Sequence, residues 1–403
     1  MDSIDEHVNS GLGAASLDQP SRVIFGLDAA NQLPIEIRKL TGGEAKAFVV
    51  CDRFLAGSSE FKTIIRSLNS NGISTETYDK VDSEPNVEAV DAMISAMSGH
   101  DFTCVVGIGG GSALDRAKFA AVIYPNGGPT ESYLTFEPRL QRNPLPKILM
   151  PTTAGTGSEV STFAVAIGRD RVKRFLQGHA ALADVAIIDP RLTLSCPSKV
   201  TAGSGMDALG TSIEAMLSKK ATSMSDTLSL TAIRLVGRHL RRAVEVGSDI
   251  HARYHMSLAA MYGGLAVNTP AACNISHCIA EILGPMLGVP HGMAVAITTP
   301  HGMSFNLPAC KQKMMAIAEA LTTPAQNASS DQAAQIAIGA VNQLVKDIGL
   351  PSSFGRASLG NDKLDEVANF IVNTQQYAYD LPNINPVPLT FQNVRNLLTQ
   401  VCS

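Results

Sequence analysis

Short apolar runs alternate with amphipathic stretches in the first half of the chain. Four of the runs have the length and the aliphatic content of buried strands: residues 47–51, 103–108, 147–150 and 185–188. Two stretches between them repeat apolar residues at helical spacing: residues 54–71 and 112–124. Strands that alternate with helices indicate βαβ units, so we predict an α/β domain with a mostly parallel sheet.

The pattern changes after Asp189-Pro190. Six long segments beyond that point show helical periodicity: residues 201–217, 224–244, 250–265, 274–283, 314–321 and 331–348. The first residues are polar, contain Gly and Ser, and show no periodicity. The pattern therefore divides the chain into a flexible arm (residues 1–20), an α/β domain (residues 21–190) and an all-α domain (residues 191–403).

Composition narrows the class of protein. Of the 403 residues, 45% are hydrophobic and 17% are charged, which excludes an intrinsically disordered chain. The net charge of −4 offers no basic surface to nucleic acid or to an anionic membrane. No apolar run approaches the roughly 18 residues that a membrane-spanning helix needs. A globular enzyme that acts on small molecules fits these properties.

Cysteine usage and the N-terminus indicate the compartment. The seven cysteines are an odd number without a C-x-x-C motif, which indicates reduced thiols and a cytoplasmic location. Cys51, Cys104 and Cys278 have apolar neighbours, and we interpret them as small buried hydrophobic residues. The first twenty residues contain no Lys or Arg, so we expect neither a signal nor a transit peptide.

A glycine-rich turn, Gly107-Ile108-Gly109-Gly110-Gly111-Ser112, follows the second predicted strand and opens a helix. Glycines let the backbone approach a pyrophosphate, and the helix N-terminus offers unpaired N–H groups. An ordinary tight turn is the alternative, but three consecutive glycines and a serine favour phosphate binding. The motif is neither a P-loop nor G-x-G-x-x-G, because Ser112 occupies the third glycine position. Ser112 and Asp115 also predict a capping-box-like helix start.

Two further segments have the chemistry of a nucleotide site. Asp52 ends the first predicted strand, where a carboxylate accepts hydrogen bonds from ribose hydroxyls and repels a 2′-phosphate. The alternative is an acid that caps the next helix. The segment 151–159 (PTTAGTGSE) follows the third strand, and its hydroxyls and glycines suit a ligand-lining loop or, alternatively, a surface loop.

Three residues of the helical half suit a divalent metal. Asp207 lies early in an apolar helix, His277 and Glu281 share a helix face at i, i+4, and His291 lies in a loop that leads to a helix. One carboxylate and two histidines form a metal site with an open position. Most other histidines are interpreted as solvated loop or helix-surface residues: His7, His100, His179, His239, His251 and His255.

These motifs, in this order, resemble the iron-containing (group III) alcohol dehydrogenase family. The motifs are Gly109-Gly110-Gly111-Ser112 with Asp115 and Lys118, the segment 151–159, Gly205-Met206-Asp207-Ala208-Leu209, His277 and Pro290-His291-Gly292. The resemblance extends over residues 21–390. It implies a Rossmann-like dinucleotide-binding domain, a helical metal domain and an active site in the cleft between them. It also implies NAD(P)-dependent interconversion of a small aldehyde or ketone with its alcohol, and a homodimer.

The resemblance also assigns roles to single residues. Gly109, Gly110, Gly111 and Ser112 would hold the pyrophosphate, and Asp52 would face the adenosine ribose and favour NAD(H) over NADP(H). Further cofactor contacts fall on Thr152, Thr153, Ser158 and Lys173. The metal, Fe²⁺ or Zn²⁺, falls on Asp207, His277 and His291.

The chain departs from the family pattern at two positions. The family motif D-A-L-x-H ends here in Thr211, so a usual fourth ligand is missing, and Glu281 replaces a histidine expected beside the nicotinamide. We assign His277 and Glu281 to the chemistry. Glu281 would complete the metal coordination, act as a general acid in a metal-free reductase, or form a structural ion pair. A lyase or cyclase that resembles dehydroquinate synthases and uses NAD without net redox change is the alternative function.

Overall fold

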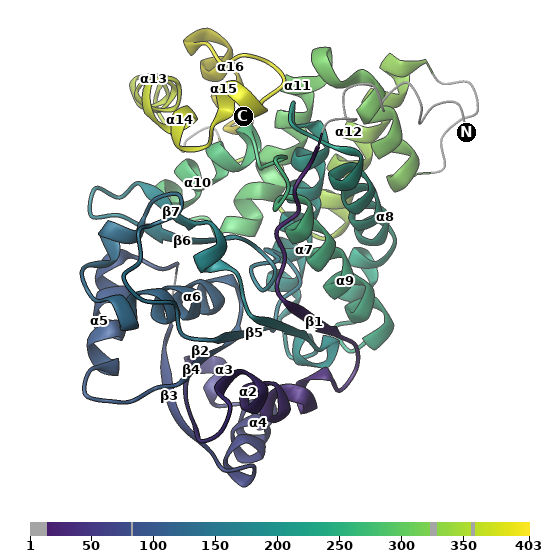
Figure 1. The fold of residues 1–403 in the computed structure, drawn as a ribbon. Helices are drawn as coiled ribbons and strands as arrows, with labels where there is room; N and C mark the ends of the chain where they lie inside the picture. The colour runs from purple at the N-terminus through teal and green to yellow at the C-terminus, as the bar shows by residue number, and fades with distance from the viewer. Residues whose placement is uncertain (1–13, 82–83, 323–328, 356–358) are drawn as a thin grey trace. The chain divides into compact units, whose positions relative to one another are not determined.

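The computed structural model describes residues 14–81, 84–322, 329–355 and 359–403. The chain divides into two compact units (Figure 1). The first, the sheet unit, consists of Asp18–Thr153 and Gly157–Cys196, and the second, the helical unit, contains Ala154–Thr156 and Pro197–Ser403. Most of the predicted arm lies outside the described residues, and residues 14–20 form neither helix nor strand.

The sheet unit is built on a six-stranded parallel sheet with the strand order β1-β8-β5-β4-β2-β3. Its strands are β1 (Arg22–Phe25), β2 (Ala45–Asp52), β3 (Ile73–Val81), β4 (Cys104–Gly109), β5 (Lys147–Pro151) and β8 (Val185–Ile188). The four strands that the sequence predicts are the adjacent inner members β8, β5, β4 and β2, and nearly all of their residues are buried. Strands buried on both faces form continuous apolar runs, which explains why these four were recognisable.

Helices cover both faces of this sheet. On one face, Phe48 and Val50 of β2 pack with residues of α5 (Val87–Met97) and α6 (Gly111–Asn126). On the other face, Val49 and Cys51 pack with residues of α2 (Leu33–Thr41) and α4 (Ser59–Ser70). This alternation confirms the predicted α/β class, because successive side chains of a strand point to opposite faces.

Two local features of the sheet unit differ from the sequence pattern. The single helix predicted over residues 54–71 is divided into α3 (Arg53–Ala56) and α4, because the Ser58 hydroxyl accepts a hydrogen bond from the Phe61 N–H and starts a new helix. An antiparallel hairpin of β6 (Phe163–Ile167) and β7 (Lys173–Gln177) was not predicted.

The helical unit contains no strand among its described residues, in agreement with the all-α prediction. Its helices are α7 (Ser198–Leu217), α8 (Ser223–Glu245), α9 (Ile250–Ala266), α10 (Ile275–Leu287), α11 (His291–Leu321), α12 (Ser330–Asp347), α13 (Asn361–Phe370), α14 (Gln376–Ala378), α15 (Leu381–Ile384) and α16 (Phe391–Val401). Each of the six predicted segments overlaps one of them. Prolines hid most of α11 from the sequence pattern: it continues through Pro300 and Pro308 and is non-helical at Cys310.

Helix α7 is the centre of the helical unit. It is buried along most of its length and packs against α8, α9 and α11. Glycines let its neighbours approach closely: a Cβ on Gly205 would lie 2.2 Å from Leu240 of α8. A Cβ on Gly292 would lie 2.4 Å from the backbone oxygen of Gly203. Small residues therefore fix the spacing of α7 from α8 and from the start of α11.

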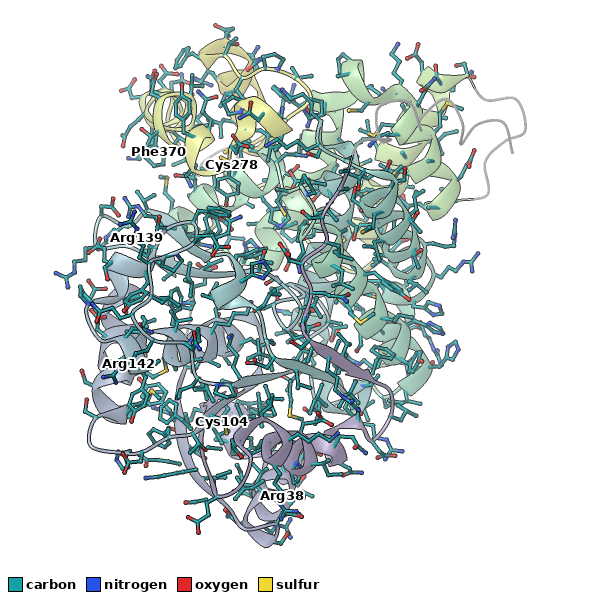
Figure 2. All side chains as sticks on the ribbon, viewed as in Figure 1. Arg38, Cys104, Arg139, Arg142, Cys278 and Phe370 are labelled. Carbon is teal, nitrogen blue, oxygen red and sulfur yellow. The ribbon has the colours of Figure 1, made fainter. Side chains whose placement is uncertain are left out.

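The structure confirms the interpretation of three cysteines as buried small residues. Cys51, Cys104 and Cys278 are fully buried, and the side-chain view places Cys104 in the sheet unit and Cys278 on α10 (Figure 2). None of the seven cysteines forms a disulfide bond in the described part of the chain. Within the described part of the chain, no helix combines the length and apolarity that a bilayer crossing needs.

We predict that Gly205→Ala lowers the free energy of unfolding by about 1–3 kcal/mol, because the added methyl group overlaps the buried Leu240 side chain. Gly339→Ala in α12 is the matched control, since nothing lies within 4 Å of its Cβ position. There alanine should raise stability by about 0.5–1 kcal/mol through its helix preference. Urea unfolding followed by circular dichroism measures both. Equal shifts in the two variants would contradict the close approach of α7 and α8.

Candidate metal centre and nucleotide-binding edge

The glycine turn joins β4 to α6 and requires glycine at its centre. Gly109 has φ +154°, and a Cβ there would lie 2.7 Å from the Ala113 Cβ. The N-cap of α6 is Gly110, which makes no side-chain cap, so the predicted capping box of Ser112 and Asp115 is wrong. The helix starts at Gly111, two residues too early for Ser112 to be its N-cap. Its first N–H groups have no intrahelical partner, and an anion at this terminus would satisfy them.

Asp52 lies beside this turn. Its Oδ1 accepts a hydrogen bond from the Leu55 N–H at 2.8 Å and caps α3, which confirms the capping interpretation. Its Oδ2 lies 3.5 Å from the position that a Cβ on Gly109 would take. The carboxylate therefore has one oxygen for the helix and one directed at the glycine turn.

Thr152 and Thr153 complete the same edge of the sheet. The Thr152 N–H donates to the Gly109 carbonyl at 2.9 Å, and the Thr153 side chain lies 3.6 Å from the Cβ position of Gly110. These residues gather where β2, β4 and β5 end. The strand order reverses between β2 and β4, because β3 lies on one side of β2 while β4, β5 and β8 follow on the other. Such a switch point is where open parallel sheets bind ligands.

Ser158 and Lys173, predicted to contact the cofactor, lie in the interior of the sheet unit. The Ser158 hydroxyl donates to Asp115 at 2.7 Å, and the Lys173 ammonium pairs with Glu84 at 2.8 Å. Their cofactor contacts stay predictions.

Behind the turn lies a buried charge cluster. Lys118 is fully buried and donates hydrogen bonds to Ser161 and to the Phe163 carbonyl. Burial lowers the pKa of Lys118 to about 8, against the opposing effect of Asp115 and Glu159. Burial likewise raises the pKa of Glu159 to about 7. From the sequence, Lys118 was recognised only as part of a family motif. Its hydrogen bonds to the segment that follows β5 were not predicted.

The predicted metal residues converge in the helical unit. Asp207 of α7, His277 of α10 and His291 at the start of α11 direct their ligand atoms at one point. The Asp207 Oδ1 lies 3.2 Å from the His277 Nε2 and 3.4 Å from the His291 Nε2. Two ligand atoms that share a tetrahedral ion at about 2.0–2.2 Å are separated by roughly this distance. The His291 Nδ1 is buried without a partner. The three residues therefore fit a divalent metal.

Glu214, which was not predicted from the sequence, contacts one of the candidate metal residues. It lies two turns after Asp207 on α7, and its carboxylate accepts hydrogen bonds from the His277 Nδ1 and from the Ser276 N–H. The first bond turns the His277 Nε2 toward Asp207, as carboxylates commonly do behind metal-binding histidines. The second satisfies the N-terminus of α10, whose N-cap residue Asn274 makes no side-chain cap. The sequence held one signal for Glu214: it lies seven residues after Asp207, a spacing that places both on the same face of a helix.

Opposing charges shift the titration of this centre. Burial alone would raise the pKa of Asp207, but His291 and His277 lower it well below its usual range. Burial lowers the pKa of His277, whereas Cys273 and the carboxylates of Glu214 and Asp207 raise it, and the result lies well above the usual value. The imidazole is therefore cationic when no metal neutralises the two carboxylates.

The two departures from the family pattern have different surroundings. The Thr211 hydroxyl lies 3.5 Å from the His277 Nε2, so it occupies the place beside the metal residues. Glu281 is half-buried one turn beyond His277 and accepts a hydrogen bond from the Tyr379 hydroxyl. Two groups of described residues have ligand atoms close enough together to hold a metal ion, and neither group includes Glu281. Its assignment as a ligand or catalyst stays a prediction.

Comparisons with known proteins identify the family of the chain. The model of the iron-containing alcohol dehydrogenases matches residues 20–190, and the model of the C-terminal region of Fe-containing alcohol dehydrogenases matches residues 201–402. Long-chain-alcohol dehydrogenase 1 of Geobacillus thermodenitrificans is 33% identical over 383 residues, which cover 93% of this chain and 95% of that protein.

Solved structures show the same fold. A 1,3-propanediol oxidoreductase aligns with a TM-score of 0.90 and 29% identity over 96% of this chain and 100% of that one. A sulfoacetaldehyde reductase from Bifidobacterium kashiwanohense, solved with NAD⁺, aligns with a TM-score of 0.84 and 28% identity over 97% and 99% of the two chains. With two family models that together span most of its residues, the chain belongs to the iron-containing alcohol dehydrogenase family.

Proposed function

We propose that this protein interconverts a small aldehyde or ketone with its alcohol, using NAD(H) and a divalent metal. The observation that carries the proposal is that one carboxylate oxygen of Asp207 lies within 3.4 Å of an imidazole nitrogen of both His277 and His291. The glycine turn at the switch point of the sheet supports the nucleotide part. The relatives are a dehydrogenase, an oxidoreductase and a reductase, which favours a redox reaction over the lyase or cyclase alternative.

The sheet unit would hold the dinucleotide. The N–H groups at the start of α6, from Gly109 to Ser112, would bind the pyrophosphate, because a helix N-terminus favours anions. Asp52 would accept hydrogen bonds from the ribose with the oxygen that faces Gly109, and its charge would disfavour a 2′-phosphate. Thr152 and Thr153 would line the same edge.

The helical unit would hold the metal, Fe²⁺ or Zn²⁺, on Asp207, His277 and His291, with Glu214 orienting His277. When bound, NADH supplies the hydride and the metal polarises the carbonyl oxygen as a Lewis acid. The Tyr379 hydroxyl donates a hydrogen bond to Glu281. Glu281 would pass a proton to the substrate oxygen that becomes the alcohol hydroxyl. The homodimer and the cytoplasmic location stay predictions, which sedimentation and cell fractionation would check.

We predict that NADH is preferred over NADPH, and that Asp52→Asn narrows the ratio of the two kcat/KM values by roughly tenfold, because the charge that repels a 2′-phosphate is lost (about 1.4 kcal/mol). Asparagine keeps an oxygen for the Leu55 N–H. Asp52→Ala should narrow the ratio similarly but also lower stability by about 1 kcal/mol, through loss of the cap. Equal kcat/KM values for NADH and NADPH in the unsubstituted protein would refute the role of Asp52.

We predict that His277→Ala and His291→Ala each remove the bound metal and the oxidation of NADH by aldehydes. Glu214→Gln should keep the fold but weaken metal affinity by about 10–100-fold, because the His277 ring loses its orienting carboxylate. His179→Ala, an exposed histidine of the sheet unit, is the control. Elemental analysis after dialysis and NADH absorbance measure the two effects. Metal content and activity that persist in both alanine variants would exclude this centre.

We predict that Glu281→Gln lowers turnover by about 10²-fold or more with unchanged metal content, and removes one limb of the pH–rate profile, because glutamine cannot transfer a proton. Tyr379→Phe keeps Glu281 and removes the hydroxyl that donates to it, so a smaller decrease is expected. Loss of metal together with activity would make Glu281 a ligand instead. Unchanged turnover and metal content would leave it a structural role.

A further inference from the structure

Three histidines form a cluster at the surface of the helical unit. They belong to other helices than Asp207, His277 and His291. His239 belongs to α8, and His251 and His255 belong to α9. Their ring centres lie 4.3 Å apart for His239 and His255, 4.4 Å for His251 and His255, and 5.5 Å for His239 and His251. From the sequence these three histidines were expected to be solvated surface residues; the packing of α8 against α9 brings them together.

The distance between two of the nitrogens suits a shared metal ion. The Nε2 atoms of His251 and His255 lie 3.1 Å apart. With metal–nitrogen bonds of about 2.0–2.1 Å, this separation gives an angle of about 100° at the metal, between octahedral and tetrahedral values. The i, i+4 spacing holds both rings on one face of α9, which is the spacing of histidine pairs that bind metals from a single helix.

His239 supplies a third imidazole from the neighbouring helix. Its ring is stacked on that of His255 with an angle of 16° between the planes. In the structure the ligand atoms of the three histidines do not all lie within 4.8 Å of one another, so His239 would join the pair at one ion only after its ring turns. The second side-chain torsion of histidine has a broad, shallow preference that permits such a turn. The ligands would then come from both α8 and α9.

The surroundings of His239 and His255 favour the neutral imidazole, which is the form that binds metals. Burial, His255, His251 and Arg238 lower the pKa of His239, against a small opposing effect of Asp249. Burial and His251 lower the pKa of His255, whose Nδ1 is buried without a hydrogen-bond partner. Asp249, the nearby carboxylate, is engaged by Arg242 at 2.7 Å and caps α9 through the Ala252 N–H. Neutral imidazoles with unshared nitrogen electron pairs are metal ligands.

We propose that His251 and His255, with His239 as the third ligand, form a second metal site that binds a divalent transition-metal cation. Three imidazoles without a carboxylate ligand select Cu²⁺, Ni²⁺ or Zn²⁺ and not Mg²⁺ or Ca²⁺, which prefer oxygen. Affinity follows the order Cu²⁺ > Ni²⁺, with Zn²⁺ below Cu²⁺. Because ions bound here connect α8 to α9 in the native state alone, they also raise the unfolding temperature.

The test is equilibrium dialysis of the full chain, without a histidine tag, against Zn²⁺ and Ni²⁺, followed by elemental analysis. The double variant His251→Ala/His255→Ala should bind one ion per chain fewer than the unsubstituted protein and keep its dehydrogenase activity. His239→Ala should weaken binding of that ion without changing the number of sites at saturation. The double variant His100→Ala/His179→Ala, which replaces a half-buried and an exposed histidine of the sheet unit, is the control and should lose no ion.

Two readouts separate this site from the Asp207 centre. In a His277→Ala background, Cu²⁺ should still bind and show nitrogen couplings in its electron paramagnetic resonance spectrum, and these should vanish when His251 and His255 are also replaced. Added Zn²⁺ should raise the unfolding temperature of the His277→Ala protein but not of the triple variant. An unchanged number of bound ions in the double variant, or a Cu²⁺ spectrum without nitrogen couplings, would overturn the proposal.

Discussion

Two carboxylates on the buried helix α7 hold one imidazole from opposite sides. Asp207 faces the Nε2 of His277, and Glu214 accepts a hydrogen bond from its Nδ1. Two buried carboxylates so close to one imidazole need a compensating positive charge, either a proton on His277 or a metal ion. Removing one partner from such a buried ionic network costs about 3–5 kcal/mol. The geometry of α7, α10 and α11 follows from it: Glu214 fixes the start of α10, and the contact of Gly203 with Gly292 fixes the residue that follows His291.

The fold was predictable where local pattern and tertiary environment agree. The inner strands β2, β4, β5 and β8 are buried on both faces, so their sequences are continuously apolar. The edge strand β3 has the sequence ISTETYDKV, with few buried residues, and its pattern could not separate it from a loop. The division at Ser58 and the helical start of α11 were hidden for other reasons. The division at Ser58 depends on a single hydroxyl cap. Helix α11 contains prolines, which usually end a helix but are tolerated here by tertiary packing.

The residues of the site that belong to sequence motifs were predictable, and those outside the motifs were not. Asp207, His277 and His291 come from three helices; their ligand chemistry suggested a metal site and the family resemblance supported the grouping, before the structure brought their ligand atoms together. Glu214 escaped because one acid in a long apolar helix has many structural explanations, and its partner is 63 residues away. The histidines of α8 and α9 escaped for the same reason: an i, i+4 pair is visible in the sequence, but the third ring arrives through packing.

The distribution of thiols gives each unit its own reporter of opening. Five cysteines are buried, and Cys196 and Cys273 are half-buried. Burial raises the pKa of Cys104 to about 12, and the pKa of Cys278 on α10 is also raised well above its ordinary value. Since the thiolate is the reactive form, neither residue reacts with alkylating reagents until its surroundings open. Mass spectrometric labelling rates at Cys104 and Cys278 would therefore report the local opening of the sheet and helical units separately, without an introduced probe.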